Sequence, residues 1–327
     1  MKTIKNIVSY DAENAEFLAI LKNHSREVLP TAVQFELESR YRREENNGDF
    51  RDLSFACILK DETAVVVLWH RVGLSNGFLA GGAHVFSGGR QVTSQEVKDV
   101  ISVMKEKAFV EGLSHIKIST PVISSELSEF GSILHNRNAI PQIVFQAELD
   151  LKQPEEFIRK NVRKSYKSLL NKGEKILTFK TLTQETVEER LFYDFKNFHH
   201  TTADRRTRND SSWHLQLEMI KKGCGELLLG YLEGHDLVSA ALFIDYGPST
   251  TYAVGVYDRS FFDRPLAHAS LYKGIISAKN RGQLSFNLGI MPNVEKASEK
   301  ELSIAYFKKG FHPSLKQIIT WQLDLSD

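Results

Sequence analysis

The chain has 327 residues, of which 42% are hydrophobic and 25% are charged. This composition is typical of a globular protein with a sizeable core, and the length allows two domains of ordinary size. A formal net charge of +1 excludes a protein that coats nucleic acid by bulk charge, so a polyanion would have to meet a local basic patch, and we expect no DNA partner.

The N-terminal segment, residues 1–17, has no apolar core of signal-peptide length. No stretch approaches the roughly 18 to 20 apolar residues of a membrane span. Cys57 and Cys224 lie far apart without metal-ligand spacing, which indicates free thiols in a reducing compartment. We therefore expect a cytoplasmic protein without a transmembrane segment.

The first half of the chain carries the pattern of a small α/β domain. The first segment has a helical pattern. The sequence then predicts a hairpin of strands at 55–60 and 64–71, a strand at 77–86, a helix at 95–111 and a strand at 115–119. A glycine, Gly112, follows the long helix as its expected stop.

The second half repeats this order of elements. A hairpin is predicted at 226–232 and 238–246, then a strand at 250–257, a helix beginning near Pro265 and a strand at 284–288, with Gly282 as the helix stop. We predict an α/β (α+β) fold with two subdomains, residues 1–150 and 151–327. Each should contain a mixed, largely antiparallel sheet flanked by helices.

A basic helix is predicted over residues 154–173, at the start of the second half. Arg159, Arg163 and Lys167 recur at four-residue spacing, with Lys160 and Lys164 beside them. This patch is either a solvated helix face or a contact surface for a phosphate-rich substrate.

Residues 251–311 carry the strongest functional pattern. A strand splayed from its neighbour leads to a helix whose first turn contains a proline and small residues. Free backbone N–H groups and the positive end of the helix dipole at such a start favour an anion. The candidates to bind the phosphate or carbonyl of a donor are therefore Arg264, Ala267, His268 and Ala269. An ordinary helix start with small core-facing residues explains the same pattern.

This turn and three other segments resemble known acyltransferases. The spacing Arg-x-x-Ala-x-Ala at 264–269 resembles the pyrophosphate-binding turn of GNAT acyltransferases, with alanine at both glycine positions. Residues 157–173, 192–206, 251–289 and 304–313 together resemble the Fem-type (FemABX) aminoacyltransferases, a family built of two GNAT-like subdomains. The last segment, with Phe307-Lys308-x-x-Phe311, is the most specific, whereas the first half matches only in element order.

The resemblance implies that the C-terminal subdomain carries the active site. It implies that Lys308 acts there and that Phe307 packs against the donor. A fixed ammonium next to the carbonyl oxygen would favour the transition state of aminolysis over the ground state. The family's aspartate and paired glycines are replaced by Asn287, Gly289 and Ile290, which is a departure near the site.

Four residues are predicted to contact the acceptor: Arg205, Arg206, Arg163 and Tyr257. Arg205 and Arg206 lie in an arginine-rich loop that could grip phosphates, where the family places an arginine for its nucleotide-linked acceptor. Helix-terminal cations on a solvated loop explain these arginines equally well. No metal site is expected, because His199 and His200 diverge on a helix and no further ligand lies at zinc spacing.

The hypothesis that follows is an N-acyltransferase of the Fem type. It would move an aminoacyl or acyl group onto an amine of a precursor for peptidoglycan or other cell-envelope biosynthesis, or of a related metabolite. Acyl-CoA or aminoacyl-tRNA would be the co-substrate, with no permanently bound cofactor, and the acceptor would be a small-molecule or nucleotide-linked precursor. Two alternatives stay open: a GNAT N-acetyltransferase that uses acyl-CoA on a small amine, and a non-catalytic GNAT-like binding protein.

Overall fold

The protein forms two compact units. The structure, a computed structural model, describes residues 2–10, 15–24, 30–46, 49–78, 81–123 and 126–325. Unit 1 comprises Met1–Ala32, Asn46–Phe145 and Lys316–Asp327, and unit 2 comprises Val33–Glu45 and Gln146–Leu315. These units follow contacts, whereas the predicted subdomains at 1–150 and 151–327 follow the repeat in element order. That division stays a prediction.

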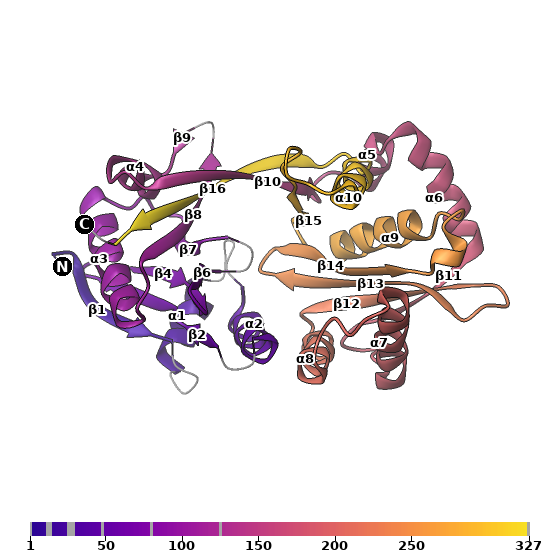
Figure 1. The fold of residues 1–327 in the computed structure, drawn as a ribbon, viewed down its shortest axis with the longest axis horizontal. Helices are drawn as coiled ribbons and strands as arrows, with labels where there is room; N and C mark the ends of the chain where they lie inside the picture. The colour runs from indigo at the N-terminus through magenta and orange to yellow at the C-terminus, as the bar shows by residue number, and fades with distance from the viewer. Residues whose placement is uncertain are drawn as a thin grey trace. The chain divides into compact units, whose positions relative to one another are not determined.

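Unit 1 is a mixed sheet with helices (Figure 1). Its elements are β1 (Ile4–Ser9), α1 (Ala15–His24), β2 (Phe50–Asp52), β3 (Phe55–Leu59), β4 (Ala64–Leu68), β5 (His70–Val72), β6 (Ser75–Gly77), β7 (Ala83–Phe86), α3 (Ser94–Val110), β8 (His115–Ile123), β9 (Glu126–Leu127), α4 (Glu129–Asn136) and most of β16 (Ser314–Asp324). The main sheet runs β1-β3-β4-β7-β8-β16. Its core joins Trp69, Val100, Met104, Ile118 and Trp321.

Two details of unit 1 differ from the sequence prediction. The strand predicted at 64–71 ends at Leu68, and His70–Val72 forms β5 in a separate sheet of order β2-β5-β6. The strand predicted at 77–86 is β7 and begins only at Ala83, while residues 79–80 lie outside the described part of the chain.

Unit 2 contains α2 (Ala32–Glu45), the end of β10 (Ile140–Asp150), α5 (Glu155–Asn161), α6 (Lys164–Ile176), β11 (Leu177–Leu182), α7 (Glu189–Ala203), α8 (Asp210–Lys221), β12 (Gly225–Leu232), β13 (Leu237–Tyr246), β14 (Ser249–Tyr257), the short 3-10 helix η1 (Arg259–Phe261), α9 (Leu266–Asn280), β15 (Ser285–Met291) and α10 (Glu299–Lys309). The strand order is β10-β15-β14-β13-β12-β11. Helices α6 and α9 cover one face of this sheet, and α7 and α8 cover the other (Figure 1).

The middle parts of β12 and β13 are continuous apolar runs because both faces of the sheet are covered. On β12, Leu227 and Leu229 enter the core beside α7 and α8, whereas Leu228 enters the core beneath α9. On β13, Leu242 enters the core beside α7 and α8, and Phe243 enters the core beneath α9. Successive side chains of a strand point to opposite faces, so a continuous apolar run is what a doubly covered strand requires.

The predicted splay of the strand at 250–257 is confirmed. Strands β14 and β15 pair in parallel only at Ser249↔Ser285, Thr250↔Phe286 and Thr251↔Asn287. Beyond Thr251, β14 stays paired with β13, and a bulge at Ala253 interrupts that pairing. The pairing of β14 with β15 therefore ends just before Tyr252 and Tyr257 on β14 and before Gly289 on β15.

The helix predicted over 154–173 is wrong as a single element. It consists of α5 and α6, and Val162 and Arg163 between them have extended backbone, with ψ of 149° and 137°. The backbone N–H of Arg163 donates to Gly310 O at 2.8 Å, so a tertiary hydrogen bond replaces a helical one. None of the described helices is both long and apolar enough to cross a bilayer.

Candidate functional site

Lys308 lies in the last turn of α10 and extends to the end of the paired part of β15. A Cβ atom added at Gly289 would lie 3.2 Å from Lys308 Nζ, so the ammonium rests against the backbone of that glycine. Gly289 has φ of +94°, and its N–H donates to Asn287 Oδ1 at 2.7 Å. The positive φ favours glycine, and the missing side chain leaves room for the ammonium.

The Lys308 ammonium is a partly buried charge. Burial lowers the pKa of Lys308 from its ordinary value. Within the described ranges it forms no ion pair and no side-chain hydrogen bond. A cation that is partly desolvated and has no carboxylate beside it can interact strongly with negative charge on a ligand.

Four aromatic rings, which we call the aromatic cluster, surround the start of α9: Tyr166, His268, Phe307 and Phe311. The Tyr166 and His268 ring centroids are 4.4 Å apart at 89°, and the His268 and Phe307 centroids are 5.1 Å apart at 81°. Edge-to-face contacts of this kind stabilise beyond their buried area. The cluster therefore connects α6, α9 and α10.

The end of α10 is fixed against the α5–α6 junction. Tyr166 Oη donates to Phe307 O at 3.1 Å, and the Arg163 guanidinium lies 3.8 Å from the Tyr306 ring centroid. A Cβ atom at Gly310 would lie 2.1 Å from the Tyr166 ring, so only glycine allows this approach. These contacts determine where Phe307 and Lys308 lie.

The first turn of α9 has free backbone donors. Its N-cap, Pro265, provides no side-chain cap, and the N–H groups of Ala267 and His268 find no acceptor among the described residues. Burial, and secondarily the charge of Arg163, lowers the pKa of His268 to about 4, so its imidazole is neutral at neutral pH. The turn offers two N–H groups and a neutral ring to a ligand.

The other residues predicted for the donor divide between surface and core. Arg264 is exposed, with its guanidinium 5.4 Å from the Phe261 ring centroid. Ala269 is 1% exposed, and a Cβ atom at Gly173 of α6 would lie 2.6 Å from Ala269 Cβ. Helix α6 therefore packs on the inner side of this turn.

Two tyrosines lie on the diverging part of β14. Tyr257 packs with Leu266 and Ala269 at the start of α9. Its hydroxyl lies 2.7 Å from the hydroxyl of Tyr252, which passes over Gly255. Burial raises the pKa of Tyr252 to about 12, so both hydroxyls keep their protons.

The structure does not bring Arg205 and Arg206 to the aromatic cluster. They lie between α7 and α8, which cover the opposite face of the sheet from α9 (Figure 1). Arg206 Nη2 forms an ion pair with Asp210 Oδ2 at 2.7 Å, and Lys196 pairs with the same carboxylate. A groove of about 540 Å³ lined by Lys196 and Asp210 lies there. Of the four predicted acceptor residues, only Arg163 and Tyr257 lie on the α9 side.

Neither cysteine is suited to covalent catalysis. Both thiols are free and buried, and burial raises the pKa of Cys57 to about 12 and that of Cys224 to about 11. No cluster of three or more His, Cys, Asp or Glu side chains suited to a metal ion occurs in the described part of the chain. The groups gathered on the α9 side are cations, backbone N–H groups and aromatic rings.

Sequence reasoning missed the two residues that hold the site together. Neither Tyr166, within the helix predicted at 154–173, nor Gly310 was assigned a role from the sequence. Their contact links positions far apart in the chain, as the 141-residue separation of Tyr166 and Phe307 shows. No local pattern indicates such a pair.

The arrangement of the strands and helices matches that of a solved structure, FemX, with a TM-score of 0.68 over 92% of this chain and 95% of that chain at 12% identity. The chain has the fold of FemX. A tandem GNAT protein from the clavulanic acid biosynthesis pathway gives a TM-score of 0.55 over 98% of this chain and 99% of that chain at 11% identity. The predicted fold class, a tandem GNAT-like α/β fold, is thus confirmed.

A third similar structure is the C-terminal domain of a putative lysylphosphatidylglycerol synthetase from Agrobacterium fabrum. Its TM-score is 0.55 over 95% of this chain and 93% of that chain, at 14% identity. No protein-family model matches the sequence, and no curated protein is similar to it at a significant level. These likenesses concern the fold.

Proposed function

We propose that this protein is an N-acyltransferase. It transfers an acyl or aminoacyl group from an ester or thioester donor to an amine of a cell-envelope precursor or a related metabolite. The observation that carries the proposal is the Lys308 ammonium, partly buried, without a carboxylate, and resting on Gly289 where β14 and β15 cease to pair.

The reaction fits the groups on the α9 side. The acceptor's neutral amine attacks the donor carbonyl carbon, the carbon–nitrogen bond forms, and negative charge develops on the carbonyl oxygen. The Lys308 ammonium beside that oxygen lowers the barrier, because the interaction strengthens as the charge develops. Collapse expels the alcohol or thiol, which takes up a proton as the amine loses one. No covalent enzyme intermediate is needed, in agreement with the high thiol pKa values.

The donor binds at the start of α9 in this proposal. The N–H groups of Ala267 and His268 face its phosphate or carbonyl, Arg264 adds a mobile positive charge, and Phe307 packs against the acyl portion. Ala269 contributes through its small size, since it lets α6 approach at Gly173. Both acyl-CoA and aminoacyl-tRNA carry the anionic groups that such a turn favours.

The acceptor lies near Arg163 and Tyr257, both of which are close to the start of α9. Arg163 retains donor capacity for an anionic acceptor, since its side chain makes a single hydrogen bond, to Tyr306 O, within the part of the chain that the structure describes. Arg205 and Arg206 would act on the acceptor only if it extended to the α7–α8 face. The similarity of this fold to FemX and to the domain of a putative lysylphosphatidylglycerol synthetase supports an envelope-related acceptor.

The decisive experiment compares Lys308→Met with Lys309→Met. Lys309 is adjacent and exposed, so both variants lose one charge from the same helix turn. With a donor panel of acyl-CoAs and aminoacyl-tRNAs, we expect Lys308→Met to lower kcat by about 10²- to 10³-fold, as the loss of one oxyanion donor does. Lys309→Met should keep the wild-type rate. Equal rates for the two variants would refute the assigned role.

The same panel separates the candidate donors. A bound donor raises the unfolding temperature in proportion to ln(1 + [L]/Kd). Stabilisation by acyl-CoA alone would favour the N-acetyltransferase alternative, whereas salt-sensitive stabilisation by aminoacyl-tRNA would favour the aminoacyl donor. If a donor stabilises the protein but no transfer occurs with any amine, the non-catalytic alternative holds.

A further inference from the structure

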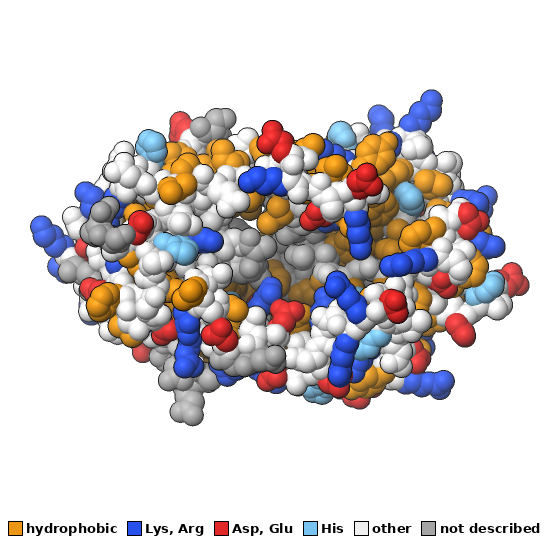
Figure 2. All heavy atoms as spheres, in the orientation of Figure 1, with side chains coloured by type: hydrophobic (Ala, Val, Ile, Leu, Met, Phe, Trp, Pro, Cys, Tyr) orange, Lys and Arg blue, Asp and Glu red, His pale blue; other side chains and the backbone are white. Residues whose placement is uncertain are grey.

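Helices α5 and α6 carry a row of cations, which we call the lysine stripe: Lys160, Lys164, Lys167, Lys172 and Lys175. All five side chains are exposed. On α6 they lie opposite the buried residues Tyr166, Leu170 and Gly173, as the helical period requires. Lys and Arg side chains project along the outer edge of α6 in Figure 2. The stripe therefore faces away from the aromatic cluster.

The charge of this segment is not balanced locally. Residues 155–176, which span α5 and α6, contain seven Lys and Arg residues against three acids, Glu155, Glu156 and Glu174, although the whole chain carries only +1. Arg159 Nη1 and Nη2 bind Glu174 at 2.6 and 2.9 Å, and Arg163 stacks on Tyr306. The lysines of the stripe form no ion pair with any residue that the structure describes. The cations left for a partner are therefore all lysines, apart from the remaining capacity of Arg163.

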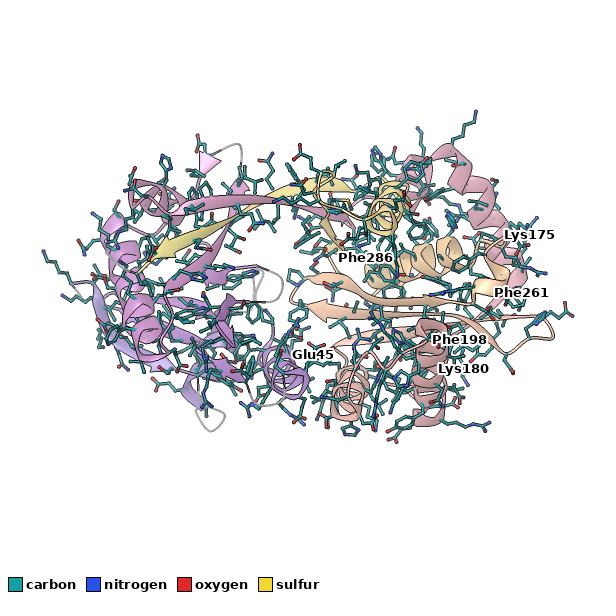
Figure 3. The ribbon with its side chains drawn as sticks, viewed as in Figure 1. Glu45, Lys175, Lys180, Phe198, Phe261 and Phe286 are labelled. Atoms are coloured by element: carbon teal, nitrogen blue, oxygen red, sulfur yellow. The ribbon has the colours of Figure 1, made fainter. Side chains whose placement is uncertain are left out.

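Large exposed aromatic side chains lie close to the stripe. Phe157 of α5 is 51% exposed and Tyr306, against the α5–α6 junction, is 64% exposed. At the far end of α6, Phe262 is 69% exposed and follows η1, whose Phe261 packs on the same hydrophobic cluster as Ile176 of α6; Phe261 and Lys175 are labelled in Figure 3. The surface thus combines unpaired ammonium groups with aromatic rings that contact water at a cost.

We propose that the lysine stripe docks the protein on an anionic phospholipid membrane, with Phe157 entering the headgroup layer. Flexible lysines suit a diffuse negative surface, whereas specific recognition of nucleic-acid phosphates relies on free arginine forks. Here the Arg159 fork is engaged by Glu174, and the Arg163 fork is partly engaged by Tyr306. Aromatic rings beside a basic helix face are what an interfacial helix places at the boundary of headgroups and acyl chains. This inference is independent of the proposed transferase activity.

The experiment measures binding of the full chain to vesicles by co-sedimentation. The vesicles contain either phosphatidylcholine alone or phosphatidylcholine with phosphatidylglycerol. We compare the wild type with the triple variant Lys164→Glu, Lys167→Glu, Lys175→Glu and with a charge-matched control, Lys60→Glu, Lys98→Glu, Lys222→Glu, whose lysines are exposed elsewhere. Circular dichroism verifies that each variant is folded. If the triple variant does not fold, the double variant Lys164→Gln, Lys167→Gln replaces it.

We expect binding only to the anionic vesicles, and weaker binding as salt rises. The triple variant should bind at least about a hundredfold more weakly, since losing each lysine near a charged surface costs roughly a factor of five and each glutamate adds repulsion. The control should bind like the wild type, and Phe157→Ser should reduce binding while keeping its salt dependence.

Three results would overturn the proposal. They are no binding to anionic vesicles, an equal loss in the stripe and control variants, and competition in which transfer RNA binds through the stripe while vesicles do not.

Discussion

Two long helices that each follow a strand, α3 in unit 1 and α9 in unit 2, begin in opposite ways. At the start of α3, Thr93 and Glu96 form a capping box: Thr93 N–H donates to Glu96 Oε2 at 2.7 Å, and Glu96 N–H donates to Thr93 Oγ1 at 3.3 Å. Arg90 also pairs with Glu96. At the start of α9, no side chain of the described residues caps the free N–H groups.

This difference indicates which of the two helix starts has free N–H groups for an anionic ligand. The Glu96 carboxylate occupies the place an anion would need, so the first turn of α3 is complete by itself. The first turn of α9 is instead held by tertiary contacts, through Tyr166, Phe307 and Gly173. Similar strand-helix-strand order therefore yields a structural helix start in one unit and a candidate binding turn in the other.

The largest expected effect tests the tertiary support of α9. Gly310→Ala places a Cβ atom 2.1 Å from the Tyr166 ring, so either α10 or the aromatic cluster has to move. We expect a loss of about 3 kcal/mol in the free energy of unfolding, measured by urea denaturation. Tyr166→Ala in the same chain should recover part of this loss. A purely additive double variant would show that the two residues are not in contact.

The next effect concerns donor binding. Ala267→Glu adds a carboxylate to the α9 turn and makes it resemble the start of α3. A donor with phosphate groups should then bind about a hundredfold more weakly, with unfolding temperature unchanged or slightly higher. Ala267→Gln, of the same size without charge, is the control in a calorimetric titration. Equal affinities for the two variants would mean that the donor binds elsewhere.

A smaller effect is the pH dependence of the free energy of unfolding that His84 causes. In unit 1, burial, and secondarily the charge of His70, lowers the pKa of His84 to about 4. The unfolded chain takes up a proton near pH 6.5, so stability falls as pH drops from 6.5 towards 4. Replacing His84 with Gln should remove about 2 kcal/mol of the difference between pH 8 and pH 5.

The smallest effect tests the capping box. Thr93→Ala should cost about 1 kcal/mol in thermal or chemical unfolding without altering donor affinity. Ser298→Ala removes the equivalent cap of α10, which pairs Ser298 with Glu301, and should cost a similar amount. A loss of donor affinity in Thr93→Ala would contradict the assignment of α3 to a structural role.

Local patterns predicted the secondary structure well where they were self-contained. The apolar runs of β12 and β13 and the helix stops at Gly112 and Gly282, with φ of +66° and +85°, followed from periodicity and turn chemistry. The break at Val162 and Arg163 did not, because the helical pattern continues through it and the hydrogen bond to Gly310 O lies far along the chain.

The candidate site was likewise predicted only in part from the sequence. Phe307 and Lys308 were predicted from a short motif, and their roles stay a proposal. Arg205 and Arg206 lie apart from them because α7 and α8 pack on the opposite face of the sheet, and a loop sequence does not indicate its face.

The sequence by itself determined the elements, their repeated order and the residues of the α9 turn, since these depend on neighbours within a few positions. Only the tertiary structure decided that Lys308 rests on Gly289 with no ion pair to a described carboxylate. It also decided that the Tyr166 ring packs against Gly310 and that β14 and β15 stop pairing after Thr251. Those features arise from close packing between segments distant in the chain. Packing of that kind depends on the combined shapes of many side chains, which no local pattern contains.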